Sequence, residues 1–143
     1  MARSITPADV LGGEAAVGRP IGGWSELMRA AQHGLPIKTI QFVIASERLS
    51  PAEIDRVVLR RKTLAHRKIA GPLTPHESGR LVRVARIIAM SETTFGSKAK
   101  AGDWLRRPTS ALDGEAPLNL LDTGDGARQV EDLLKRIDHG LTA

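Results

Sequence analysis

The sequence predicts an all-α protein, a helical bundle in which a long helix joins two small helical domains. Three observations predict this fold, and the first two are helix starts. Capping boxes are present at Ser50-Pro51-Ala52-Glu53 and at Thr74-Pro75-His76-Glu77. In each box the hydroxyl accepts a hydrogen bond from an early helix amide, the proline occupies the first helical position, and the glutamate bonds back to the cap. The third observation is helical spacing of apolar residues near the C-terminus, at Ala127, Val130, Leu134 and Ile137.

The N-terminal part contains one segment without a helical pattern and two helices. Residues 1–23 are rich in Gly, Ala and Pro, and their apolar residues follow no helical period, so we expect a flexible N-terminus. An apolar stripe then predicts a helix from Trp24 to His33, and Pro36 opens a second one. We expect both stripes to be core: Trp24, Leu27, Met28 and Ala31 in the first, and Ile37, Ile40, Val43 and Ile44 in the second.

The two capping boxes open helices of different length. The helix from Pro51 is expected to be short and to carry Ile54, Val57 and Val58. The helix from Pro75 is expected to be long, because apolar residues keep helical spacing from Leu81 toward Met90 and beyond.

Between the boxes, residues 59–69 have few apolar side chains and many cations. This stretch follows a short capped helix and a tight turn, where a helix-turn-helix places the recognition helix that enters the major groove of DNA. Lys and Arg side chains neutralise phosphates or bond guanine edges. The alternative is a basic turn that is only solvated. The candidate DNA-binding residues are Arg60, Arg61, Lys62, Thr63, His66, Arg67 and Lys68.

The C-terminal part predicts a compact helical unit with one buried seam. Ser97 caps a short helix that Pro108 ends, and the turn-rich residues 112–118 reverse the chain. Thr123 then caps a last helix, after which Gly140 stands where a left-handed C-terminal cap falls.

Charge is distributed unevenly along the 143 residues, whose formal net charge is +5. Lys and Arg predominate between Arg60 and Arg107, whereas acids predominate from Pro108 onward. This asymmetry indicates two partners of opposite character, with nucleic acid as the natural partner of the basic part. The alternative is two solvated faces.

Several kinds of chemistry find no support in the sequence. Without cysteine there is no disulfide framework or thiolate metal site, and the histidines lack metal-ligand spacing. No catalytic constellation is recognisable, so a small hydrolase has no residues behind it, and we expect no catalytic residue, metal or cofactor. No apolar run is long enough to span a membrane, and no signal-peptide pattern is present, so we expect a cytoplasmic protein.

The C-terminal part carries a series of residues in fixed order: Phe95-Gly96, Ala101, Trp104-Leu105, Pro108, Leu112, Gly114, Pro117, Gly126, Val130, Leu134, Ile137 and Gly140. In this order and spacing they resemble the toxin-binding domain of the Xre/MbcA/ParS-like antitoxins, the partners of RES-domain toxins. One departure is Asp113, which stands where the pattern usually has a glycine; aspartate tolerates the same left-handed turn. Upstream, residues 61–67 and 77–83 resemble the family's helix-turn-helix and linker helix, so that the resemblance covers residues 24–140.

The resemblance implies a domain plan and a function. Residues 24–94 are expected to form the Xre-like DNA-binding domain and residues 95–143 the toxin-binding domain. The protein is then an antitoxin without catalytic activity that covers the active site of an NAD-consuming RES toxin. It also represses its own operon, as a homodimer or within a toxin–antitoxin hetero-oligomer. The rival interpretation is a stand-alone helix-turn-helix regulator whose C-terminal helices only dimerise or bind a ligand.

Two residue sets follow for the toxin-binding domain. The first is structural, with Trp104 and Leu105 on one helical face and Gly114 and Pro117 in the turn. The second is expected to contact the toxin, because acidic side chains surround an apolar seam and complement a cation-lined NAD pocket. Its members are Asp122, Asp125, Arg128, Glu131, Asp132, Leu133, Lys135, Asp138 and Leu141, with the two leucines expected at the rim of the seam.

Overall fold

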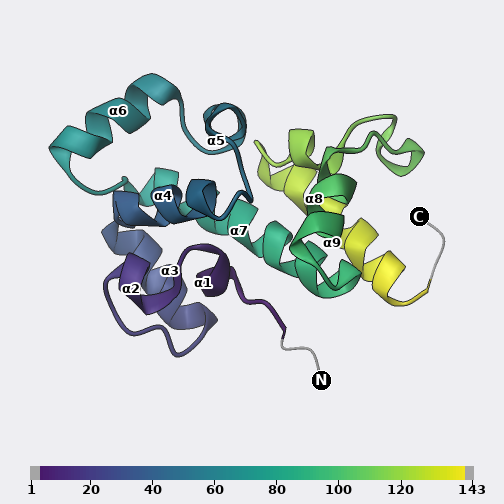
Figure 1. Cartoon of the computed structure of the whole chain (residues 1–143), viewed down its shortest axis with the longest axis horizontal. Helices are drawn as coiled ribbons and strands as arrows, with labels where there is room; N and C mark the ends of the chain where they lie inside the picture. Colours follow the sequence, from purple (N-terminus) through teal and green to yellow (C-terminus); the bar gives the residue numbers. More distant parts are fainter. Residues whose placement is uncertain (1–3, 141–143) are drawn as a thin grey trace.

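The computed structural model describes residues 4–140, and this range contains helices and turns but no β-strand. The predicted all-α fold is confirmed. Helix α7, Pro75–Phe95, runs through the middle of the molecule (Figure 1). The helices before it are α1 Pro7–Val10, α2 Gly13–Val17, α3 Trp24–His33, α4 Ile37–Ala45, α5 Pro51–Val57 and α6 Arg61–Ala70. After it come α8 Lys98–Arg106, the 3₁₀ turns η1 Ser110–Leu112 and η2 Pro117–Leu120, and α9 Gly124–Asp138.

Helix α7 is the centre of the hydrophobic core because other helices cover it on several sides. Helices α1 and α3 pack on it from the N-terminal half, and α8 and α9 pack on it from the C-terminal half (Figure 1). The predicted apolar face of α7 is therefore buried, and so are Val82, Ile87 and Ala89 beside it. One continuous cluster of buried residues extends from Val10 to Leu134, so the two halves share a core.

The predicted helix starts are confirmed in their hydrogen bonds. The Glu53 amide donates to Ser50 Oγ at 3.1 Å and the Glu77 amide donates to Thr74 Oγ1 at 3.1 Å, while each glutamate carboxylate accepts from the amide of its cap. Hydroxyls also cap α8 and α9, through Ser97 and Thr123. Local sequence therefore determines where the main helices begin.

The expectation of a flexible N-terminus is wrong for residues 5–17. Thr6 and Asp9 form a further capping box at the start of α1, and Val10 and Leu11 are fully buried in the core. The Ile5 amide also donates to Thr93 Oγ1 of α7, at 3.2 Å. Helices of four and five residues are too short for apolar periodicity to register, so the one available signal was the box itself, in which aspartate replaces glutamate.

Trp24 does not lie in the core with the rest of its stripe. Leu27 and Ala31 are buried as expected, but Trp24 is 47% exposed. It is the first residue of α3, at the end of the helix, and its ring lies 5.5 Å from the guanidinium carbon of Arg86 in a cation–π contact. The tryptophan therefore forms part of the surface.

Replacing Gly79 tests whether this residue lies in the interior of helix α7. It lies inside the helix, and an added Cβ would have no neighbour within 4 Å, so Gly79→Ala should raise the free energy of unfolding by about 0.5–1 kcal/mol. Urea denaturation measures the change. Gly71→Ala is the control, because that site is equally open but has φ +111°, so alanine there should destabilise by about 1 kcal/mol or more. If the free energy of unfolding changed with the same sign in both variants, the helical placement of Gly79 would be contradicted.

Candidate functional site

Helices α5 and α6 form a helix-turn-helix whose turn is fixed by local bonds. Helix α5 ends at Val57 and α6 begins at Arg61, so residues 58–60 make the turn, and Leu59 buries its side chain there. The Arg61 amide donates to Asp55 Oδ1 at 2.8 Å, so a carboxylate of α5 satisfies one of the open amides at the start of α6. The two helices are thereby held at a defined angle.

One side of α6 is exposed along its whole length, and we call it the outward face of α6. It consists of Arg61, Lys62, Ala65, His66 and Ile69. No residue of α6 is buried, and Ile69 is 90% exposed. Helical spacing puts these five residues on one side, with Thr63 and Leu64 partly covered on the other. A basic face with a small residue in its middle can approach a nucleic acid backbone closely.

The other candidate cations of this region lie around that face. Arg60 and Lys68 are exposed beside it. Arg67 points to the inner side, where its Nε donates to Glu77 Oε1 at 2.9 Å. Partial burial opposes ionisation of Glu77, but bonds from Arg67 and from the Thr74 amide outweigh it and lower the pKa of the carboxyl. Arg67 therefore attaches α6 to α7 in this structure.

The exposed side of α9 carries charges of both signs. Asp125, Arg128, Asp132 and Lys135 are exposed along the helix, and Arg136 lies among them. The candidate toxin-binding residues on this side of α9 are therefore two acids and two bases. Asp122, in the loop before α9, and Asp138, at its last residue, are exposed as well.

The two leucines expected at the rim of the seam have different outcomes. Leu133 is 0% exposed and belongs to the hydrophobic core, so its placement at the rim is wrong. The apolar face of α9 is wide, because α7 and the two 3₁₀ turns all pack against it. Leu141 lies outside the described residues.

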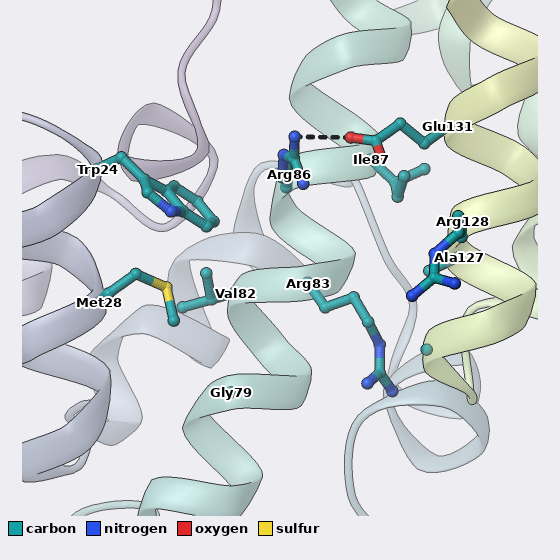
Figure 2. A pocket seen from close by; sticks show the side chains of 11 residues that line it. Trp24, Met28, Gly79, Val82, Arg83, Arg86, Ile87, Ala127, Arg128 and Glu131 are labelled. Atoms are coloured by element: carbon teal, nitrogen blue, oxygen red, sulfur yellow. Dashed lines mark ion pairs between the residues drawn. The ribbon is translucent and has the colours of Figure 1, made fainter.

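Glu131, the remaining candidate of α9, lines a pocket between α3, α7 and α9 (Figure 2). Its Oε1 lies 2.6 Å from Arg86 Nη2, and Arg86 also faces the Trp24 ring. Arg83, on the same pocket, donates from Nη2 to the Asp122 carbonyl at 3.2 Å. Burial and the charge of Arg80 lower the pKa of Arg83, and Asp122 partly opposes this. Sequence reasoning missed this junction, because its members come from three distant segments.

The predicted structural residues of the C-terminal half lie where helix α8 and the following turns meet the core. Leu105 is buried, and the half-buried Trp104 has its ring centroid 5.2 Å from that of Phe95. Pro117 is buried at the start of η2, and Gly114 has φ +84°. Asp113 adopts the left-handed φ of +55° that its place in the turn requires.

The described residues contain neither a cluster of metal ligands nor a helix that could span a membrane. Among residues 4–140, no group of three or more His, Asp or Glu side chains is arranged to hold a metal ion. No helix in the same range has both the length and the apolar character to cross a membrane.

Comparison with known proteins identifies two family domains in the chain. Residues 26–86 match the antitoxin Xre-like helix-turn-helix domain, which contains α5 and α6. Residues 90–140 match the antitoxin Xre/MbcA/ParS C-terminal toxin-binding domain, which contains α8 and α9.

Three curated proteins are among the similar relatives. An "Antitoxin Xre" of Pseudomonas putida is 39% identical over 92 residues, which are 64% of this chain and 58% of that protein. An "Antitoxin Xre" of Yersinia enterocolitica is 30% identical over 128 residues, covering 87% of this chain and 86% of that protein. A "Prs ADP-ribosylating antitoxin" of Sphingobium is 31% identical over 81 residues, 50% of this chain and 51% of that protein.

Proposed function

The chain belongs to the family of Xre antitoxins, with a DNA-binding helix-turn-helix and a toxin-binding domain, and we propose that it neutralises a RES-domain toxin and represses its own operon. In this proposal residues 24–94 bind operator DNA and residues 95–143 bind over the toxin's active site. The protein acts in the cytoplasm and by binding alone, without catalysis or a cofactor. It binds DNA as a homodimer or as part of a hetero-oligomer with toxin.

The outward face of α6 is the observation that carries the DNA-binding part. Its cations follow a short capped helix and a fixed turn, the arrangement in which a recognition helix enters the major groove. Arg60, Arg61, Lys62 and Lys68 contact phosphates or guanine edges in this proposal, with Thr63 and His66 adding contacts. Arg67 can reach DNA only by leaving Glu77.

The toxin-binding part rests on the exposed charges of the C-terminal half. A toxin that binds NAD must hold the negative pyrophosphate, so we expect cations at the mouth of its pocket, and Asp122, Asp125, Asp132 and Asp138 complement such charges. Arg128 and Lys135 then meet acidic groups around that mouth. The Sphingobium relative supports an NAD-using toxin, because its name refers to ADP-ribosylation, a reaction that takes its donor group from NAD.

Removing α9 cannot test the toxin-binding part, because Val130, Leu133 and Leu134 are fully buried and their loss would open the core. Surface charges give a cleaner test. The double variant Asp125→Lys/Asp132→Lys should bind the partner RES-domain toxin, sought among the proteins encoded beside this gene, at least about tenfold more weakly, because complementary charge becomes repulsive. Co-purification, titration and protection of NAD in the toxin's reaction measure the loss.

The matched control is Glu14→Lys/Glu47→Lys, which changes the net charge equally at exposed residues of the N-terminal half. It should bind and neutralise like the parent. Equal weakening by both double variants would indicate an effect of total charge and remove α9 from the interface. Absence of a RES-domain protein from the neighbouring reading frames, or of any complex between it and the parent, would favour the stand-alone regulator instead.

A further inference from the structure

Arg106 of α8 makes a bidentate contact with the helix-turn-helix half of the chain. Its Nε donates to Glu53 Oε2 at 2.8 Å, and its Nη2 donates to Glu53 Oε1 at 2.9 Å. Nη2 also donates to the backbone carbonyl of Arg48, at 3.0 Å. A planar guanidinium suits this fork geometry, and such paired bonds fix the direction as well as the distance between two elements.

The carboxylate that Arg106 holds is the one that caps α5. Glu53 Oε1 accepts from the Ser50 amide at 2.9 Å, in the capping box that starts the first helix of the helix-turn-helix. Partial burial opposes ionisation of Glu53, but the bonds from Arg106 and Ser50 prevail and lower the pKa of the carboxyl. Glu53 is thus ionised at neutral pH and belongs to both halves at once.

The loop before α5 is held from the same side. Arg48 donates from Nε and Nη2 to the buried Glu92 of α7, at 2.7 and 3.0 Å. Lys98 of α8 donates to the carbonyl of Ser46 at 2.6 Å. The start of α5 is therefore fixed by polar bonds to α7 and α8.

The orientation of α6 depends on that start. Because α6 has no fully buried residue, few contacts hold it: the turn after α5, the Asp55 bond to its first amide, the Arg67–Glu77 pair and the partly buried Leu64. A tilt of α5 would move the outward face of α6 with it. Recognition in a groove is sensitive to such a tilt, because several contacts must form together.

We propose that Arg106, in the toxin-binding half, is a positioning residue for DNA binding that holds α5 and α6 in the operator-binding orientation through Glu53. This inference rests on the proposed function of the helix-turn-helix. It adds a residue of α8, outside the helix-turn-helix domain, to the part of the chain that determines DNA binding.

The test compares Arg106→Ala with Arg107→Ala, by fluorescence anisotropy on a double-stranded fragment of the region upstream of the gene. The two changes remove the same charge from neighbouring residues, but the Arg107 side chain is exposed and makes no hydrogen bond or ion pair within residues 4–140. Arg106→Ala should weaken binding about threefold to thirtyfold, the range expected when a coupling residue is removed. Arg107→Ala should bind like the parent.

The salt dependence separates positioning from direct contact. If Arg106→Ala leaves a smaller fraction of the protein in the DNA-binding orientation, its affinity for DNA falls by the same factor at every salt concentration. The slope of log affinity against log salt should therefore not change in this variant. A slope lower by about one unit would instead show a lost phosphate contact and overturn the inference. Parent-like affinity of Arg106→Ala would overturn it as well.

Two smaller changes test the same pair, and if Arg106→Ala is poorly folded both are compared with the parent alone. Arg106→Lys keeps one charged bond to Glu53 and Glu53→Gln removes the charge of the carboxylate, so each should bind more weakly than the parent. With a folded Arg106→Ala, the lysine variant should lie between parent and alanine, and Glu53→Gln should add little when combined with Arg106→Ala. Positioning through Glu53 would be refuted if the losses of DNA affinity in Glu53→Gln and Arg106→Ala were additive. It would also be refuted if Arg106→Lys bound DNA no better than Arg106→Ala. If the parent does not bind the fragment, the proposed function fails. If the parent binds and the Arg106 and Glu53 variants bind equally well, only this inference fails.

Discussion

Gly126→Ala should lower the free energy of unfolding by about 3 kcal/mol and reduce the amount of folded antitoxin available to either partner. Gly126 is buried in the first turn of α9, and a Cβ there would lie 2.0 Å from the backbone carbonyl oxygen of Leu120. Backbone atoms cannot move aside as a flexible side chain does, so the start of α9 must shift away from η2. Urea denaturation with the parent as reference measures the loss.

Gly124→Ala is the matched control for that prediction. It lies two residues earlier in the same helix, and the nearest atom to its added Cβ is the Arg83 guanidinium nitrogen at 3.9 Å. We expect a change within about 0.5 kcal/mol. Equal destabilisation at both positions would mean that a Cβ anywhere in the first turn of α9, rather than the contact with Leu120, explains the effect.

Arg61→Ala/Lys62→Ala should weaken operator binding by about ten- to a hundredfold and lower the salt slope by about two units, because each lost phosphate contact removes about one. Both side chains are exposed, and the bond from the Arg61 amide to Asp55 is retained in alanine, so the helix itself should persist. Anisotropy titrations at several salt concentrations give both quantities.

The control for the α6 variant is Arg19→Ala/Arg136→Ala, which removes two exposed cations outside α6. Its affinity for the operator fragment should fall little, since neither side chain belongs to the outward face of α6. A comparable loss in the control would show that net charge alone governs DNA binding and would withdraw α6 from the recognition role.

Features that depend on neighbouring residues were predictable from the sequence. The hydroxyl caps at Ser50, Thr74, Ser97 and Thr123 were all found where local chemistry placed them. The left-handed turn at Asp113 was equally local. Helix α1 is the exception, because a helix of four residues offers no periodicity and only its capping box marked it.

Features that depend on packing between distant residues were not predictable in the same way. Leu133 is buried and Trp24 exposed for the same reason, namely how far neighbouring helices extend over α9 and over the start of α3. The second partner of Glu53 is Arg106, 53 residues away, and no local pattern marks such a pair. The candidate DNA-binding surface follows from sequence better than the toxin-binding surface, because α6 is a single exposed helix.

The central claim is that one chain carries two separate binding surfaces, and a crossed comparison of two double variants tests it most directly. Arg61→Ala/Lys62→Ala and Asp125→Lys/Asp132→Lys are each titrated with the operator fragment and with the RES-domain toxin proposed as the partner. The account predicts that the first variant loses DNA and keeps the toxin, and that the second keeps DNA and loses the toxin. Loss of both partners in either folded variant, or retention of the toxin by the second, would contradict it.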